Sequence, residues 1–130
     1  METILILEKR NTLRILLQEE LEGEGYHILF AESDKDALKK LQEYDLDLIV
    51  ADYYVPPTEL YLTMLHEADK NKGVPVLIHT AYPCELIDFN AYGPIECLSK
   101  RSDLTMLKSK IKEMLRSRKH LTTTRQISQD

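Results

Sequence analysis

Four polar side chains follow four apolar segments of this 130-residue chain, each at or just past the point where the segment ends. They are Glu8, Asp52, Thr80 and Lys100. Together they offer two carboxylates, a hydroxyl and an ammonium group. A carboxylate can act as a nucleophile or hold a divalent cation, while hydroxyl and ammonium groups stabilise the oxygens of a transferring phosphoryl group. If the fold brings these four side chains together, they suit phosphoryl-transfer chemistry.

The segments that carry these residues are predicted to be strands. They are residues 3–7, 26–30, 46–51, 74–79 and 95–98. The third segment is apolar for most of its length, which is typical of a strand buried on both faces of a sheet. It delivers Asp52 to its carboxyl end, and Pro56 and Pro57 then turn the chain toward the next helix.

Helical periodicity fills the intervals between the first three strands. The first helix places four leucines at helical spacing and ends at Gly23 and Gly25. These leucines are Leu13, Leu16, Leu17 and Leu21. The second helix opens with Ser33, and Asp36 follows three residues later in a pattern close to a capping box.

Two further helices and one weak segment are predicted in the second half of the chain. The third helix begins near Pro57 and stops by Gly73, and its buried positions are drawn from Leu60, Met64, Leu65 and Ala68. The last helix carries Leu104, Leu107, Ile111 and Leu115 on one face. Pro83 and Gly93 restrict the segment before the fifth strand, so a short or distorted fourth helix is expected there.

Strands that alternate with helices predict right-handed crossovers and a parallel sheet covered on both faces. Five such units in a chain of this length fit a flavodoxin-like (βα)5 three-layer α/β fold with strand order 2-1-3-4-5. Ligands of such sheets bind at the carboxyl ends of the strands, where the four polar residues are expected to meet.

At these positions the sequence resembles the receiver domain of bacterial response regulators. The resemblance spans roughly residues 2–118 and rests on "TILILEKRNTLRILLQEELEGEGY", "DLIVADYYVPP", "VPVLIHTA" and "IECLSK". It implies that Asp52 accepts a phosphoryl group from a histidine kinase, that Thr80 contacts this group and that Lys100 pairs with it. It also implies a Mg²⁺ site made by Glu8, Asp52 and the main-chain carbonyl of Tyr54.

Lys9 stands where the family has a second acidic residue, the direct Mg²⁺ ligand. An ammonium group supplies no oxygen ligand and repels the ion, so only a weak Mg²⁺ site is predicted. Two placements of Lys9 remain open. Its side chain either pairs with Asp52 and replaces the charge of the metal, or extends into solvent beside a weakened site.

Other departures affect the surroundings of the site. Cys97 occupies the switch position where the family often has an aromatic residue, and Arg101 replaces a proline after Lys100, so no cis bond is expected there. Tyr54 and Tyr82 lie at positions that flank the crevice in the family.

The two cysteines of the chain, at positions 84 and 97, show no metal or disulfide-scaffold spacing and are interpreted as reduced packing residues of a cytosolic protein. His79 alternates away from Thr80 and is predicted to pack against the fold.

Composition excludes several classes of function. The net charge is −5, which disfavours nucleic-acid binding, and the basic segment 101–119 is interpreted as a solvated helix face. No apolar run approaches the roughly 20 residues of a membrane span, and no signal peptide is recognisable. We expect a cytoplasmic receiver domain at residues 1–119 and a polar, fraying tail at 120–130.

Three hypotheses follow from the sequence. The leading one is a non-enzymatic, single-domain receiver that is phosphorylated on Asp52 by a histidine kinase or phosphotransfer protein and signals by contact with a downstream protein. The alternative is a pseudo-receiver, a protein-interaction module that works without phosphorylation, as Lys9, Cys97 and Arg101 suggest. The third is an enzyme or cofactor binder on the same sheet, such as a flavin carrier or a small-molecule phosphatase. The bulky, charged stretch "LEKRNT" after the first strand disfavours flavin.

Overall fold

A five-stranded parallel sheet forms the centre of the molecule in a computed structural model that describes residues 1–88 and 95–129. Its strand order is β2-β1-β3-β4-β5. The strands are β1 (Thr3–Leu7), β2 (His27–Ala31), β3 (Leu48–Ala51), β4 (Val76–Thr80) and β5 (Ile95–Ser99). The predicted flavodoxin-like architecture and strand order are confirmed.

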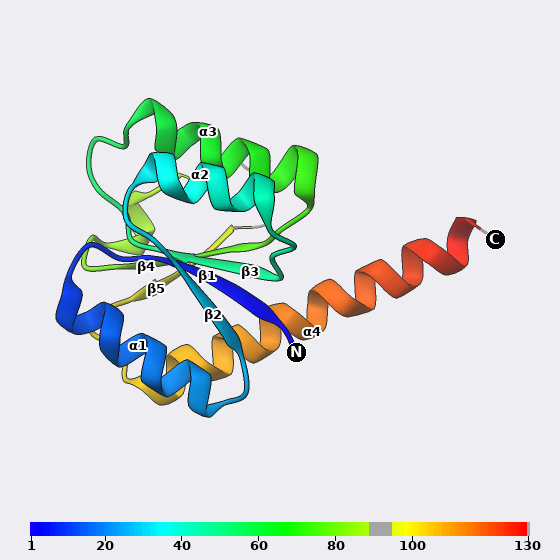
Figure 1. The fold of residues 1–130 in the computed structure, drawn as a ribbon, viewed down its shortest axis with the longest axis horizontal. Coiled ribbons are helices and arrows are strands. Elements are labelled where there is room, and N and C mark those ends of the chain that lie inside the picture. The colour runs from blue at the N-terminus through cyan, green and yellow to red at the C-terminus, as the bar shows by residue number, and fades with distance from the viewer. Residues whose placement is uncertain (89–94, 130) are drawn as a thin grey trace.

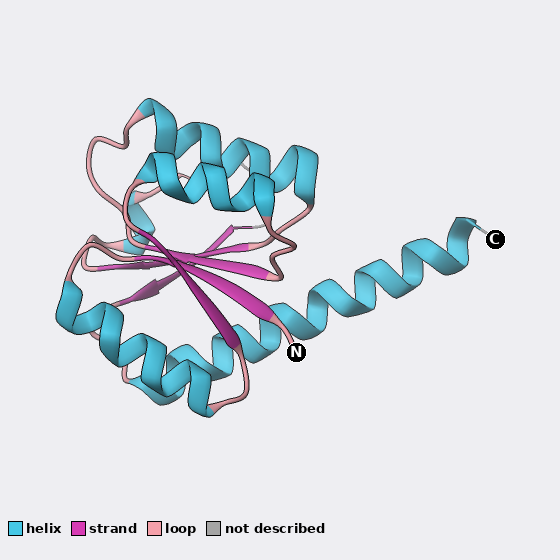
Figure 2. Ribbon diagram, viewed as in Figure 1, coloured by secondary structure: helices cyan, strands magenta, loops and turns pink. Residues whose placement is uncertain are grey.

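Helices cover both faces of the sheet. They are α1 (Asn11–Gly23), α2 (Asp34–Glu43), α3 (Glu59–Glu67) and α4 (Leu104–Gln129). Figures 1 and 2 show α1 and α4 on one face of the sheet and α2 and α3 on the other. The π-helical turn η1 (Ala68–Lys72) extends α3, and the 3₁₀ turn η2 (Cys84–Leu86) follows β4.

Alternation along the strands divides the core into two clusters. Ile4 and Ile6 of β1 belong to the cluster that packs against α1 and α4, whereas Leu5 and Leu7 belong to the cluster under α2 and α3. Every residue of β3 is buried, as its continuous apolar sequence predicted. Both faces of the central strands are therefore filled, and only the strand ends are free to present polar groups.

Side-chain caps fix where two of the helices begin. The Ser33 hydroxyl accepts a hydrogen bond from the Asp36 N–H at 3.1 Å, which confirms the predicted start of α2. The Thr58 hydroxyl accepts from the Tyr61 N–H at 3.0 Å and starts α3 just after the prolines. Of the residues from which the buried positions of α3 were drawn, Met64, Leu65 and Ala68 are buried. Leu60 is 43% exposed, and Leu16 of α1 is 41% exposed. Each lies one position outside the apolar stripe of its helix.

The segment between β4 and β5 contains the single turn η2 in place of a full helix within its described part. The rest of the predicted short fourth helix falls on residues 89–94, which lie outside the described residues. Helix α4 continues to Gln129, where the sequence predicted a fraying tail from residue 120. Its length explains the arm that extends past the sheet in Figure 1.

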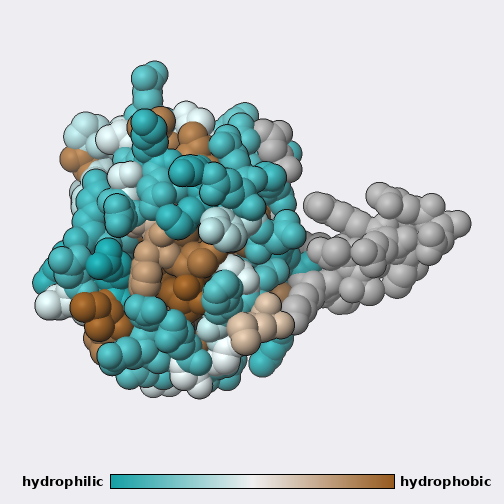
Figure 3. All heavy atoms as spheres, viewed as in Figure 1, coloured by the Kyte–Doolittle hydropathy of each residue, from teal (hydrophilic) through white to brown (hydrophobic). Residues whose placement is uncertain are grey.

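The surface in Figure 3 is mostly hydrophilic, with an apolar area between the two helical layers. None of the helices that the structure describes has both the length and the apolar character needed to cross a bilayer.

Candidate functional site

The ammonium group of Lys100 joins two buried carboxylates at the carboxyl edge of the sheet. Its Nζ lies 2.7 Å from Glu8 Oε1 and 2.7 Å from Asp52 Oδ2. Glu8 follows β1, Asp52 follows β3 and Lys100 follows β5, and the two carboxylate residues are only 2% and 7% exposed. The strand order places β1 and β3 side by side, which brings the two carboxylates together.

Main-chain groups hold the remaining carboxylate oxygens. Glu8 Oε2 accepts a hydrogen bond from the Arg10 N–H at 3.0 Å, and Asp52 Oδ1 accepts from the Tyr53 N–H at 2.7 Å. Each carboxylate thus has one oxygen on the ammonium group and one on a peptide N–H. These contacts offset the cost of burying two negative charges. They also fix the direction in which Asp52 presents its oxygens.

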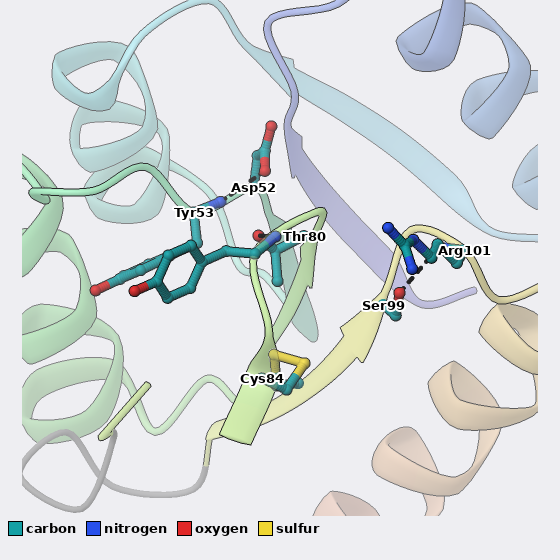
Figure 4. Close-up of a disulfide and its surroundings, with 8 residues drawn as sticks. Asp52, Tyr53, Thr80, Cys84, Ser99 and Arg101 are labelled. Carbon is teal, nitrogen blue, oxygen red and sulfur yellow. Dashed lines mark hydrogen bonds between the residues drawn. A yellow bond between two sulfur atoms is a disulfide. The ribbon is translucent and has the colours of Figure 1, made fainter. Parts of the chain in front are cut away.

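Thr80 is buried at the end of β4, the strand next to β3. Its hydroxyl accepts a hydrogen bond from the Tyr82 N–H at 3.0 Å, and its carbonyl accepts one from the Lys100 N–H at 2.8 Å. Figure 4 shows Thr80 beside Asp52. The structure thus brings together all four residues that the strand-end pattern selected.

Lys9 lies outside this charged cluster. Its side chain is exposed, and Nζ sits 4.7 Å from the centre of the Tyr54 ring, a cation–π contact. Among the residues that the structure describes, Lys9 forms no ion pair, so of the two placements left open the exposed one holds and the pairing with Asp52 does not. Lys100 occupies that place instead. Glu8 turns into the crevice and the next side chain, Lys9, turns out to the rim, where it flanks the crevice with Tyr54.

A tyrosine that the sequence analysis missed supports the main chain of Asp52. The Tyr61 hydroxyl donates a hydrogen bond to the Asp52 carbonyl at 2.6 Å, and Tyr61 is 1% exposed. Burial, together with the charge of Asp52, raises the pKa of this hydroxyl, so it remains a proton donor. The available signal was its spacing with Met64, Leu65 and Ala68, which places it on the buried stripe of α3.

Aromatic contacts extend from this tyrosine across the crevice. The Tyr53 ring lies 6.0 Å from the Tyr61 ring in an edge-on arrangement and 6.0 Å from the Tyr82 ring. Tyr82 is joined to Thr80 through its main-chain N–H, and the Tyr54 ring lies under the Lys9 ammonium group. Burial and the nearby Asp52 carboxylate raise the pKa of the Tyr54 hydroxyl. It therefore stays neutral beside the two carboxylates.

The expectation of two reduced cysteines is wrong. Cys84 of η2 and Cys97 of β5 form a disulfide with their Cα atoms 5.8 Å apart (Figure 4). That separation is ordinary for a disulfide. The two residues are 13 positions apart, and the sequence around them contains no motif that predicts the pairing. The bond depends on the β4–β5 register, which places Cys97 opposite Ile78.

Two further expectations concern the ends of the strands. The peptide bond between Lys100 and Arg101 is trans, as the sequence indicated, because the one cis bond of the described residues lies at Val55–Pro56. His79 is buried, which confirms its predicted packing role. Burial and the positive charge of Lys100 lower its pKa.

Comparison with known proteins identifies relatives of this arrangement. A family model described as the response regulator receiver domain matches residues 4–112. Histidine kinase P4 of Formosa agariphila is 32% identical over 124 residues, which cover 92% of this chain and 9% of that protein. The transcriptional regulatory protein ZraR of Escherichia coli K12 is 27% identical over 114 residues, 86% of this chain and 26% of that protein. The chain therefore spans only a minor part of these two curated relatives.

Solved structures agree with these relatives. Response regulator TrrA of Thermotoga maritima, in complex with Mg²⁺–BeF, has a TM-score of 0.74 and 31% identity. A second structure, of histidine kinase ThkA in complex with TrrA, matches with a TM-score of 0.74 and 33% identity. Each match covers 88% of this chain and 99% of the solved one.

Proposed function

Because the chain belongs to the response regulator receiver domain family, we propose that Asp52 accepts a phosphoryl group from a histidine kinase or a phosphotransfer protein. The domain then passes the signal on by contact with a downstream protein. The observation that carries this proposal is the buried Asp52 carboxylate, which lies 2.7 Å from the Lys100 ammonium group. Both groups lie at the carboxyl ends of the strands, where β4 also ends with Thr80.

We infer a part of the transfer for each side chain from its contacts. An Asp52 oxygen attacks the phosphorus atom of a phosphohistidine, a new O–P bond forms, and the N–P bond to the donor breaks. Lys100 already touches Asp52 and offsets the charge that gathers on the phosphoryl oxygens. Thr80 offers its hydroxyl proton to one of these oxygens. The Tyr61 hydrogen bond keeps the Asp52 main chain in place during the reaction.

We infer a Mg²⁺ site from the two buried carboxylates. Glu8 and Asp52 would supply their carboxylates and Tyr54, as the family resemblance implies, its main-chain carbonyl, a donor set that suits an ion which retains several waters. Bound Mg²⁺ offsets negative charge between the acceptor and the phosphoryl group. We expect weak binding, because Lys100 already pairs with both carboxylates and Lys9 adds a second positive charge at the rim.

The choice of partner rests on the solved relative. The response regulator TrrA was crystallised in complex with the histidine kinase ThkA, and that structure matches this chain at 33% identity. We propose a kinase of the same class for this domain and a cytoplasmic site of action. The domain serves as a signalling module rather than as an enzyme.

Intact mass measurement tests the phosphoacceptor directly. Wild type, Asp52→Asn and Asp45→Asn are incubated with acetyl phosphate and Mg²⁺ and then weighed. Asp45 is exposed and provides a matched control. We expect one added phosphoryl group in the wild type and in Asp45→Asn, and none in Asp52→Asn. A phosphoryl gain in Asp52→Asn equal to that of the wild type would show that the acceptor is elsewhere.

The pseudo-receiver remains the second candidate, because Lys9 replaces the direct metal ligand and Cys97 is locked in a disulfide. It is favoured if the wild type gains no phosphoryl group from acetyl phosphate or from a histidine kinase.

A further inference from the structure

The Cys84–Cys97 disulfide joins the two chain segments that deliver Thr80 and Lys100 to the site. Cys84 lies four residues after Thr80, and Cys97 lies three residues before Lys100. The same segments are joined again at the crevice, where the Lys100 N–H donates to the Thr80 carbonyl at 2.8 Å. Thr80, the loop at 81–83, the disulfide and the end of β5 therefore form a closed ring beside Asp52 (Figure 4).

The loop within this ring is tied to the Thr80 hydroxyl. That hydroxyl accepts a hydrogen bond from the Tyr82 N–H at 3.0 Å. If Thr80 turns toward a phosphoryl group on Asp52, Tyr82 must follow it or lose its acceptor. Either result moves residues 81–83, and Cys84 anchors the end of this loop to β5. The disulfide thus opposes the movement that phosphoryl binding requires of Thr80.

The disulfide does not lie in the buried core of the domain. Both cysteines are half-buried rather than buried, and Pro83 and Glu85 on either side of Cys84 are exposed. The described part of this segment contains one 3₁₀ turn and no α-helix to shield the sulfurs. In a reducing compartment such a disulfide is typically transient and regulatory rather than structural.

We propose that Cys84 and Cys97 form a reversible thiol–disulfide switch, which a dithiol reductant opens to release the Thr80 loop. A thiolate of the reductant attacks the Cys84 sulfur, and Cys97 leaves as a thiolate. The second thiol of the reductant then attacks the reductant's first sulfur, which is bonded to Cys84 in the mixed disulfide, and Cys84 leaves as a thiolate. Two electrons pass to the protein, both cysteine sulfurs take up protons, and the reductant becomes a cyclic disulfide.

The redox half of the proposal is tested without any phosphoryl chemistry. The full chain is purified without reductant and divided, and one half is treated with dithiothreitol under native conditions and desalted. Both halves are alkylated with iodoacetamide and weighed. We expect two alkyl groups after reduction and none before it. The melting temperature should fall by roughly 5–10 °C on reduction, because a loop of this length is no longer closed. Free thiols before reduction, or no labelling after it, overturns the switch.

The coupling half rests on the proposed function of Asp52. Oxidised and reduced wild type are given acetyl phosphate and Mg²⁺, and the phosphoryl mass is followed with time. We expect uptake to be roughly threefold faster or more after reduction, since loop movements of this kind limit rates. Equal rates overturn the coupling.

A variant that carries both Cys84→Ser and Cys97→Ser provides the control. It should take up phosphoryl groups at the rate of the reduced wild type, and dithiothreitol should not change this rate. A dithiothreitol effect on the variant would show that the reagent acts elsewhere and would overturn the coupling. No uptake in any sample rejects both the proposed function and the coupling, while the alkylation result still decides whether the disulfide is reversible.

Discussion

At the scale of single residues, the ion pairs of Lys100 decide the charge of the crevice. One ammonium group contacts two carboxylates, each at 2.7 Å, so the cluster of Glu8, Asp52 and Lys100 has a net charge of −1. Removal of one partner from a buried ion pair leaves an uncompensated charge and is strongly destabilising. Lys100 therefore stabilises the fold at the same position where, in the proposed function, it pairs with the acceptor.

Tyr61 is the residue whose hydroxyl we expect to support both the stability of the fold and the uptake of the phosphoryl group. Tyr61→Phe keeps the ring contact with Tyr53 but leaves the buried Asp52 carbonyl without its donor. The free energy of unfolding should fall by about 1–3 kcal/mol, the cost of an unpaired buried group. Phosphoryl uptake should also slow, since the Asp52 main chain loses a support. Tyr44→Phe, at an exposed position, is the matched control for urea unfolding and for uptake. Unchanged stability in Tyr61→Phe would remove Tyr61 from this role.

At the scale of elements, the periodicity of the sequence predicts the strands and most of the helices. Strand ends also predict which residues meet, because the carboxyl ends of parallel strands share one edge of the sheet. One open question and two missed contacts depend on details that periodicity does not contain. The direction of Lys9 is set where β1 ends, the Tyr61 bond depends on how α3 packs, and the disulfide depends on the register of β4 and β5.

Strand β4 carries a residue that should make stability depend on pH. Burial, followed by the charge of Lys100, lowers the pKa of His79 below the value of 6.5 expected in the unfolded chain. As the pH falls below about 6.5, the unfolded chain binds a proton that the folded chain does not. Stability is therefore complete above this pH and decreases as the pH falls toward the folded-state pKa.

Urea midpoints of the wild type and of His79→Leu at pH 7.5, 6.5 and 5.5 measure this effect. The wild type should lose stability across the series, and His79→Leu should lose less, whatever its stability at pH 7.5. His27 is exposed, so His27→Gln should follow the wild type. If the urea midpoints of the wild type and His79→Leu fall equally with pH, His79 is not the source of the pH dependence.

At the scale of the whole molecule, ion pairs join helix α4 to the rest of the domain. Three basic residues of this helix pair with acidic partners on other elements: Lys108 with Glu20, Lys110 with Glu96 and Arg118 with Asp47. The basic segment 101–119 is thus partly neutralised within the fold. This supports its interpretation as a helix face rather than as a nucleic-acid patch.

The balance of charge in the crevice leads to a prediction about Mg²⁺ and the stability of the whole domain. Lys100 already compensates the carboxylates, so the fold does not need a metal to relieve their repulsion. Melting temperatures measured with chelator and with millimolar Mg²⁺ should differ by less than about 2 °C in the wild type. A ligand at 100 times its dissociation constant stabilises by about 2.7 kcal/mol, so a tight site would be obvious.

The effect of Mg²⁺ on the melting temperature of the wild type is compared with its effect on Lys9→Asp. Lys9 contacts the Tyr54 ring and not Asp52, so its replacement should change the melting temperature in chelator only slightly. The change removes a positive charge from the rim and adds an oxygen ligand, so Mg²⁺ should now raise the melting temperature. Lys112→Asp, at an exposed position of α4, should show no such gain. If Mg²⁺ stabilises Lys9→Asp no more than the wild type, the Lys100 ion pairs, and not the missing acidic residue, keep the metal out of this crevice.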